Sequence, residues 1–493
     1  MELFEINAHN LSKLLKERKI SSEEIVKSFI ERIKNVDDKL HAYISYNFEN
    51  ALVQAKECDK SLKKDASDLP PLFGVPISIK DILCMKDTRV TCGSKILENF
   101  IAPYDATVVE KIKNNGLIIL GKCNMDEFAM GSSTENSYFG PSFNPWDITR
   151  VPGGSSGGSA VCVSAKESPL SLGSDTGGSI RQPAACCGVI GLKPTYGRVS
   201  RYGLVAFASS LDQIGPFSNS VLDCALIMNV ISGYDERDST SINIEVPDYT
   251  KYLIPDIKGI KIGIPREYFV KGIDPEVANS IDNAIKLFEK LGATIKSISL
   301  PHTEYCLATY YIIATAEASS NLGRYDGVHY GYRDKTAKNL GDMYRWTRDQ
   351  GFGKEVKRRI MLGTYVLSAG YYDAYYLKAQ KVRTLIKRDF EEAFKECDFL
   401  LTPTTPTPAF KIGEKVSDPV QMYLSDIFTI SVNLAGLPAI SIPCGISSDN
   451  LPIGMQLIGK PFCEGEILKV GWNYEKNTER RLKPATTMWN APV

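Results

Sequence analysis

Two glycine- and serine-rich segments follow each other closely in this 493-residue chain. The first, residues 151–160, reads VPGGSSGGSA, and the second, residues 173–184, reads GSDTGGSIRQPA. Glycine allows the backbone to approach a ligand closely, and a serine in such a loop presents its hydroxyl beside free backbone N–H groups. A nucleophile and an oxyanion hole are two of the parts that acyl transfer requires, so we expect acyl-transfer chemistry here.

A serine nucleophile also needs a base. The chain contains four histidines, His9, His41, His302 and His329. None lies near either segment or has the sequence setting of a catalytic base, and lysine takes this role in Ser–Lys variants. Lys80 closes the run GVPISIK, which predicts a buried strand with a charge at its end. Burial would lower the pKa of this lysine and make a neutral amine available, whereas an ion pair with Asp81 is the alternative.

The order of Lys80, the GGSSGGS tract and the GGSI tract resembles the amidase signature family, whose members use a Ser–cisSer–Lys triad. The resemblance implies that Ser179 is the nucleophile and Lys80 the base. Ser155 would relay the proton between them and would form a cis peptide with Gly154. The resemblance also implies an oxyanion hole made by the backbone N–H groups of Thr176, Gly177 and Gly178.

Segments further along resemble the A-subunit family of the glutamyl-tRNA(Gln)/aspartyl-tRNA(Asn) amidotransferases, namely residues 191–203, 325–331, 355–365 and 422–429. In that family a tyrosine, an arginine and an aspartate hold the α-carboxylate and α-amino groups of the substrate. The matching positions are Tyr310, Arg359 and Asp426. A bidentate arginine suits a carboxylate, and an aspartate suits an ammonium group. Cys186 departs from the family, which more often has an aromatic residue there.

Each of these residues has a structural alternative. Arg359 could be a surface or helix-pairing charge, Asp426 could cap a helix, and Tyr310 could belong to the core beside Tyr311. Three loop residues are expected to line the pocket, with a plain turn as the alternative: Gly131, Ser132 and Ser133. A structural ion pair is expected to support the nucleophile from both sides of its loop, formed by Asp175 and Arg181.

The resemblance implies a glutaminase that hydrolyses glutamine and supplies ammonia to a partner. The partner would be a tRNA-binding kinase, the B subunit, joined by a small C subunit in a heterotrimer that amidates Glu-tRNA(Gln) or Asp-tRNA(Asn). ATP and Mg²⁺ would be used by that kinase, which would also make most contacts with tRNA. This chain would carry no cofactor and no metal.

Two other classes of protein compete with this interpretation. A free-standing amidase for small or hydrophobic amides would not need Arg359 together with Asp426 in its acyl pocket. A non-catalytic assembly protein would not need the intact set of Lys80, Ser155 and Ser179.

Composition narrows the function classes. Lysine and arginine total 58 against 58 acidic residues, and a formal net charge of zero argues against broad electrostatic binding of nucleic acid. No apolar run approaches the roughly 20 residues of a membrane-spanning helix, and the N-terminal segment lacks targeting features, so we expect a cytoplasmic protein. The 12 cysteines show no zinc spacing and are expected to be reduced and buried. No Gly-Lys-[Ser/Thr] follows the first glycine tract, so a P-loop for ATP is excluded.

The elements that position these residues alternate along the chain. A capping box at Ser21 and Glu24 predicts a helix, and Asp274-Pro275 begins another that closes at Gly292. A helix is expected over residues 107–115, with strands over 117–120, 294–300, 398–401, 439–443 and 454–459. This order predicts an α/β fold with a large, mixed, twisted sheet and helices on both faces. We expect one domain over 1–493, with an N-terminal helical region (1–68), a core carrying the triad (69–220) and a substrate-pocket region (221–493).

Overall fold

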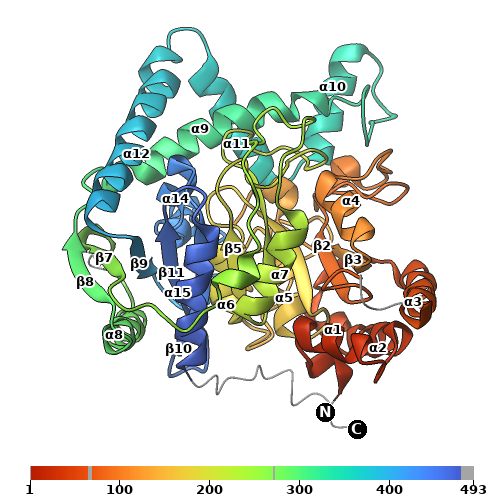
Figure 1. Ribbon diagram of the computed structural model, residues 1–493. Coiled ribbons are helices and arrows are strands. Elements are labelled where there is room, and N and C mark those ends of the chain that lie inside the picture. The colour runs from red at the N-terminus through yellow and green to blue at the C-terminus, as the bar shows by residue number, and fades with distance from the viewer. Residues whose placement is uncertain (1, 65–68, 270–271, 479–493) are drawn as a thin grey trace.

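The computed structural model describes residues 2–64, 69–269 and 272–478. Within these residues the strands form a mixed sheet of eleven, in the order β1-β3-β2-β4-β6-β5-β10-β11-β9-β7-β8 (Figure 1). The strands are β1 (Tyr43–Tyr46), β2 (Pro76–Lys80), β3 (Ile118–Cys123), β4 (Leu170–Asp175), β5 (Ile190–Lys193), β6 (Gln213–Ser218), β7 (Lys261–Pro265), β8 (Thr294–Ile298), β9 (Phe399–Pro403), β10 (Ala439–Ile446) and β11 (Pro452–Gly459). All three segments of the predicted single domain contribute strands to this sheet.

The helices surround the sheet and its connecting loops (Figure 1). They are α1 (Ala8–Lys16), α2 (Ser22–Leu40), α3 (Phe48–Lys64), α4 (Thr107–Asn114), α5 (Gly157–Ser164), α6 (Arg181–Cys187), α7 (Val221–Ile231), α8 (Pro275–Lys290), α9 (Cys306–Asn321), α10 (Leu340–Gly351), α11 (Lys354–Leu367), α12 (Lys378–Glu396), α13 (Pro419–Tyr423), α14 (Ile430–Ala435) and α15 (Glu464–Lys476). None of the helices in the described ranges is long and apolar enough to cross a membrane.

Helices pack on both faces of the sheet, as β11 demonstrates. Side chains an odd number of residues apart on a strand point to opposite faces. A Cβ added at Gly454 would lie 2.6 Å from the side chain of Ala185 in α6, and one at Gly459 would lie 2.7 Å from Ile467 in α15. The two helices therefore cover opposite faces, and the predicted α/β fold with a large mixed sheet is confirmed.

The predicted elements are present, with shifts at their ends. Ser21 and Glu24 form both halves of a capping box at α2, and the Asp274 side chain accepts a hydrogen bond from the Glu276 N–H at the start of α8. Strand β10 continues past Pro443, beyond its expected end. The register shifts after this proline, and such an irregularity lets a strand accommodate a residue that cannot donate a hydrogen bond.

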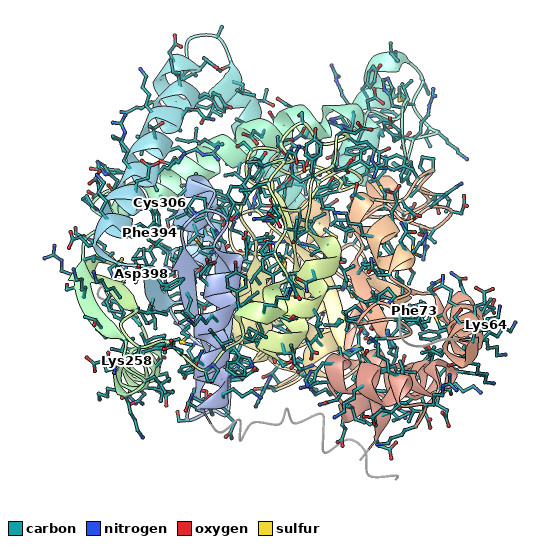
Figure 2. All side chains as sticks on the ribbon, in the orientation of Figure 1. Lys64, Phe73, Lys258, Cys306, Phe394 and Asp398 are labelled. Carbon is teal, nitrogen blue, oxygen red and sulfur yellow. The ribbon has the colours of Figure 1, made fainter. Side chains whose placement is uncertain are left out.

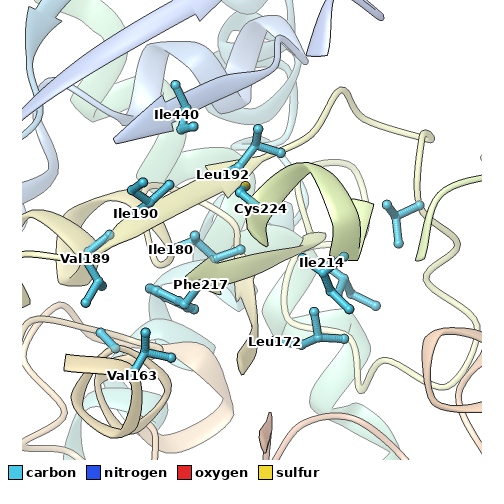
Figure 3. Packing of buried hydrophobic residues seen from close by; sticks show 14 of the residues in the cluster. Val163, Leu172, Ile180, Val189, Ile190, Leu192, Ile214, Phe217, Cys224 and Ile440 are labelled. Carbon is cyan, nitrogen blue, oxygen red and sulfur yellow. The ribbon is translucent and has the colours of Figure 1, made fainter. Parts of the chain in front are cut away.

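The buried cluster under the two glycine tracts anchors the neighbourhood of Ser179. Ile180 directly follows Ser179 and is fully buried, and it lies among Leu172 of β4, Ile214 of β6 and Phe217 of β6 (Figure 3). Burying a large aliphatic side chain contributes about 1.5–3 kcal/mol. The residue after Ser179 therefore fixes this turn to the core.

The cysteines are part of the same interior. Ten of the 12 are buried, two are half-buried, and all have free thiols. Cys306, the first residue of α9, is one of the buried thiols (Figure 2). The described residues contain no group of three or more histidine, cysteine or acidic side chains that could hold a metal ion.

Candidate active site

Lys80 is the last residue of β2 and is fully buried. Strands β2 and β4 are parallel neighbours, so their carboxyl ends meet at the same edge of the sheet. The Lys80 Nζ lies 2.8 Å from Ser155 Oγ, 2.8 Å from Ser156 Oγ and 2.9 Å from Ser174 Oγ. The sheet thus places the amine within a cage of three hydroxyl groups.

The burial of Lys80 determines its protonation. Burial lowers the pKa of Lys80 to about 7, although the negative charges of Asp126 and Asp175 oppose this shift. The alternative ion pair with Asp81 is wrong, because Asp81 lies 3.6 Å from Lys122 instead and accepts hydrogen bonds from Thr91. A substantial fraction of the Lys80 amine is therefore neutral at physiological pH.

The peptide bond between Gly154 and Ser155 is cis, as the resemblance implied. The Ser155 carbonyl accepts a hydrogen bond from the Asp126 N–H (3.2 Å), and the Gly154 N–H donates to the Gln182 side chain (2.9 Å). A Cβ at Gly154 would overlap the Asp126 carboxylate and lie 2.6 Å from the Ser133 nitrogen. Glycine is required here because neighbouring backbone approaches so closely.

Ser179 lies beside this segment and is 7% exposed. Its carbonyl accepts a hydrogen bond from the Ser156 N–H (3.2 Å), which joins the two glycine tracts directly. Over the described parts of the chain, no hydrogen bond links the Ser155 and Ser179 hydroxyls. The structure thus shows a hydrogen bond between Lys80 and Ser155. Ser179 is held beside this pair by the backbone hydrogen bond to Ser156.

Asp175 and Arg181 form the expected structural pair within the Ser179 loop (residues 175–181). Both are fully buried, with Arg181 Nε 3.0 Å from Asp175 Oδ2. Burial acts to raise the pKa of Asp175, but the Arg181 charge and its hydrogen bonds outweigh burial and lower this pKa to about 2. The carboxylate therefore stays ionised and holds the loop.

The same carboxylate changes the expected oxyanion hole. The Gly178 N–H donates to Asp175 Oδ1 (2.8 Å), so it is already engaged. In contrast, the N–H groups of Thr176, Gly177 and Ser179 donate to no group in the part of the chain that the structure describes. The available oxyanion donors are thus Thr176 and Gly177 from the predicted set, together with Ser179.

Arg359 lies on α11 and is 3% exposed, so it is not a surface charge. Its Nε donates to Glu355 Oε1 (2.7 Å), one turn earlier on the same helix, and the Tyr423 hydroxyl donates to the same oxygen (2.8 Å). The guanidinium carbon lies 5.3 Å from the ring centre of Tyr311 and 5.4 Å from that of Tyr423. Helix pairing and aromatic packing together hold the guanidinium, whose Nη atoms remain able to take a bidentate carboxylate.

Asp426 is 8% exposed, and its side chain caps none of the helices that the structure describes. The Ser132 hydroxyl donates to Asp426 Oδ2, whereas Oδ1 has no hydrogen-bond partner in the described residues. Burial raises the pKa of Asp426 to about 7. A buried carboxylate with an unpartnered oxygen is costly without a ligand, and a cationic group is its natural complement.

Thr429 connects the Asp426 segment to the Ser179 loop. Its hydroxyl oxygen lies 2.6 Å from the Gly177 carbonyl and 3.0 Å from the Asp426 carbonyl. Tyr310 covers the same loop, because a Cβ at Gly177 would lie 2.6 Å from the Tyr310 hydroxyl. Tyr310 also packs edge-on against Tyr311 at 5.0 Å, so it is a core residue that also covers the Ser179 loop.

The residues of the loop over 131–133 have two different roles. A Cβ at Gly131 would overlap the Asp126 carboxylate, and the Ser133 N–H donates to that carboxylate (3.3 Å). Gly131 and Ser133 therefore shape the turn, while Ser132 extends to Asp426.

Four residues of the site were not singled out from the sequence. Ser156 stands in the first glycine tract, so its type and position were a usable signal. Ser174 stands in the second tract and carried the same signal. Asp126 and Glu355 carry no local signal, because their importance arises only from contacts with Ser155 and Arg359.

A buried lysine, a cis serine and a glycine-flanked serine on a mixed α/β sheet are the features of a serine-dependent amide hydrolase. The amidase family matches residues 24–468, and the chain belongs to this family.

Among its relatives, the A subunit of glutamyl-tRNA(Gln) amidotransferase from Carboxydothermus hydrogenoformans is 62% identical, over 97% of this chain and 98% of the relative. The protein of the same name from Geobacter sp. (strain M21) is 58% identical, over 98% of this chain and 100% of the relative. The crystal structure of the same A subunit from Thermotoga maritima gives a TM-score of 0.81 at 44% identity, covering 98% of this chain and 97% of that one. Within the amidase family the chain therefore groups with these A subunits.

Proposed function

We propose that this chain is the glutaminase component of a tRNA-dependent amidotransferase. The observation that carries the proposal is the buried carboxylate of Asp426, which Thr429 connects to the Ser179 loop, together with the buried guanidinium of Arg359, whose charge acts on Asp426. Glutamine is a primary amide with an α-carboxylate and an α-ammonium group. A buried guanidinium and a buried carboxylate complement these two charges, whereas a hydrophobic amide would leave the unpartnered Asp426 Oδ1 without a ligand.

In the first half of the reaction Ser179 Oγ attacks the side-chain amide carbon of glutamine. Its proton passes to Ser155, and the Ser155 proton passes to the neutral Lys80 amine. The N–H groups of Thr176 and Gly177 stabilise the oxyanion. When the C–N bond breaks, the Lys80 ammonium returns its proton through Ser155, so that ammonia leaves and a glutamyl ester remains on Ser179.

In the second half a water molecule attacks the ester carbonyl, and Lys80 again accepts the proton. The proton then returns to Ser179 Oγ as glutamate departs. Protons and charges balance over both halves, because each transfer to Lys80 is followed by a transfer away from it. A base with a pKa close to the working pH is suited to this two-way role.

The names of the relatives, A subunits of an amidotransferase, support an assembly of several subunits, in which we propose that another subunit uses the ammonia. We propose a cytoplasmic heterotrimer with a tRNA-binding kinase, the B subunit, and a small C subunit, which converts Glu-tRNA(Gln) or Asp-tRNA(Asn) to the amidated form. ATP and Mg²⁺ would act in the kinase, which would also provide most tRNA contacts. This chain would supply ammonia and need no cofactor of its own.

The proposal is tested by comparing kcat/KM for glutamine, 4-aminobutanamide and hexanamide, using the full-length chain with the proteins that co-purify from its native cell. The second substrate is glutamine without its α-carboxylate, and the third lacks both charges. We expect glutamine to be strongly preferred and Ser179→Ala to remove all three activities. A preference for hexanamide would overturn the proposal in favour of a free-standing amidase.

A further inference from the structure

Glu127 directly follows Asp126, whose N–H donates to the Ser155 carbonyl, and it contacts the start of α11. It is 3% exposed, and its Oε2 accepts a hydrogen bond from the Gly353 N–H (2.8 Å). The Ser94 hydroxyl donates to its other oxygen. Gly353 is the N-cap of α11, the helix that carries Arg359. A carboxylate at a helix N-terminus is stabilised both by the N–H donor and by the helix dipole.

The residue before Glu127 has different hydrogen-bond partners. The Asp126 N–H donates to the Ser155 carbonyl, and the Asp126 carboxylate accepts a hydrogen bond from the Thr134 N–H (2.9 Å). Two consecutive residues thus join the backbone of Ser155 to the start of α11. Arg359 stands six residues after Gly353, which is about 9 Å along a helix.

The contact between Glu127 and Gly353 is close enough to exclude a side chain. Gly353 has φ −71° and ψ 170°, an extended conformation that any residue adopts, so its backbone does not require glycine. A Cβ at Gly353 would nevertheless overlap Glu127 Oε2. An aromatic contact reinforces the junction, because the rings of Phe128 and Phe352 lie 5.8 Å apart.

We infer that Glu127 is a positioning residue that sets the distance between the α-carboxylate site at Arg359 and the acyl-transfer site at Ser155 and Ser179. The inference rests on the proposed function and adds a specificity determinant to it. Glu127 touches neither substrate nor reacting atoms. By holding α11, Glu127 lets the guanidinium reach the α-carboxylate while the amide carbon is at Ser179, and so selects for an amino-acid amide. Small misplacements of such groups strongly reduce the reaction rate.

The test compares glutamine with 4-aminobutanamide in the full-length chain with its co-purifying proteins. Glu127→Ala should raise the KM for glutamine about tenfold, while kcat/KM for 4-aminobutanamide changes less than about twofold, since the latter makes no demand on Arg359. Glu127→Gln should remain within about threefold of the parent, because its amide oxygen can accept from Gly353 and its NH₂ can donate to Ser94. Lys354→Ala, at an exposed position in the first turn of α11, is the matched control and should behave as the parent.

The glycine on the other side of the contact gives an independent measurement. Gly353→Ala should reproduce the loss of glutamine affinity, because its Cβ displaces the Glu127 carboxylate. In the Glu127→Ala background the added methyl group has room, so Gly353→Ala should raise the KM for glutamine little further. This non-additivity in a double-mutant cycle identifies the contact itself as the cause.

If Glu127→Ala lowers kcat/KM equally for glutamine and for 4-aminobutanamide, the inference is overturned, since that pattern indicates a general structural role. Additive effects of Gly353→Ala and Glu127→Ala would overturn it as well. If Glu127→Ala does not fold, Gly353→Ala and Glu127→Gln decide the matter by the same substrate comparison. A parent chain without glutaminase activity would instead refute the proposed function, which separates the two failures.

Discussion

The protonation of Lys80 and Asp426 predicts how glutamine hydrolysis depends on pH. Lys80 must be neutral to accept a proton, and its pKa is lowered by burial to about 7. Asp426 must be ionised to hold the α-ammonium group, and its pKa is raised by burial to about 7. Both groups therefore lose their competent form as the pH falls through 7.

The two kinetic parameters separate these groups, because kcat/KM reports the free enzyme and kcat reports the complex with substrate. Between pH 8 and pH 6 each competent fraction falls about tenfold, so kcat/KM should fall about a hundredfold. Bound glutamine places a cation beside Asp426 and lowers its pKa, so that of these two groups only Lys80 still titrates near pH 7. We therefore expect kcat to fall only about tenfold over the same interval.

The assay is ammonia release over pH 5.5–9.5 in the full-length chain with its co-purifying proteins. Asp426→Asn should reduce the slope of kcat/KM on the acid side from two to one, and Lys80→Arg should be inactive because arginine does not deprotonate. Lys193 is the matched control, since burial also lowers its pKa to about 7 but its Nζ donates to the Pro194 carbonyl instead. Lys193→Met should leave both slopes unchanged. Identical acid limbs in kcat and kcat/KM, or an active Lys80→Arg variant, would refute the reasoning.

Three further variants test the remaining parts of the site. Ser179→Ala should abolish glutamine hydrolysis while thermal unfolding is unchanged, and ammonium chloride should rescue amidation by the assembled complex; residual glutaminase activity would exclude Ser179 as nucleophile. Arg359→Ala removes the protein's partner for the α-carboxylate of glutamine, and losing one partner of a buried charge pair costs about 2–5 kcal/mol. We therefore expect kcat/KM to fall more than tenfold for glutamine and far less for 4-aminobutanamide. Equal losses would assign Arg359 a structural role. Gly177→Ala should lower kcat with a folded protein, because its Cβ would lie 2.6 Å from the Tyr310 hydroxyl and disturb an oxyanion donor; kcat at the parent level would show that the loop tolerates the shift.

The sequence by itself determined the local elements around the site. The GVPISIK pattern predicts a strand that ends in a buried lysine, and β2 consists of five buried residues ending in Lys80. The capping residues Ser21 and Asp274 marked the starts of α2 and α8, because caps act within one helical turn. Such features depend on neighbours in the chain, which the sequence displays directly.

The roles of the residues came from resemblance to a family, since residue types alone left Lys80 with two interpretations. Only the tertiary structure decides between the serine cage and Asp81, because the parallel pairing of β2 with β4 brings Ser174 to Lys80 across 94 positions of the chain. The pKa of Lys80 depends likewise on complete burial, which is a property of the packed core.

A contact within the Ser179 loop changed the expected set of oxyanion donors, and contacts between distant segments decided the burial of Arg359. The Asp175 carboxylate takes the N–H of Gly178 that the resemblance assigned to the oxyanion, and no pattern in the second glycine tract distinguishes engaged from available donors. Arg359 is buried because the rings of Tyr311 and Tyr423 enclose it from α9 and α13. Burial is set by residues far apart in the chain, and the hydrogen-bond partner of Gly178 by the folded shape of its loop, so the fold decided which of the predicted groups are free to act.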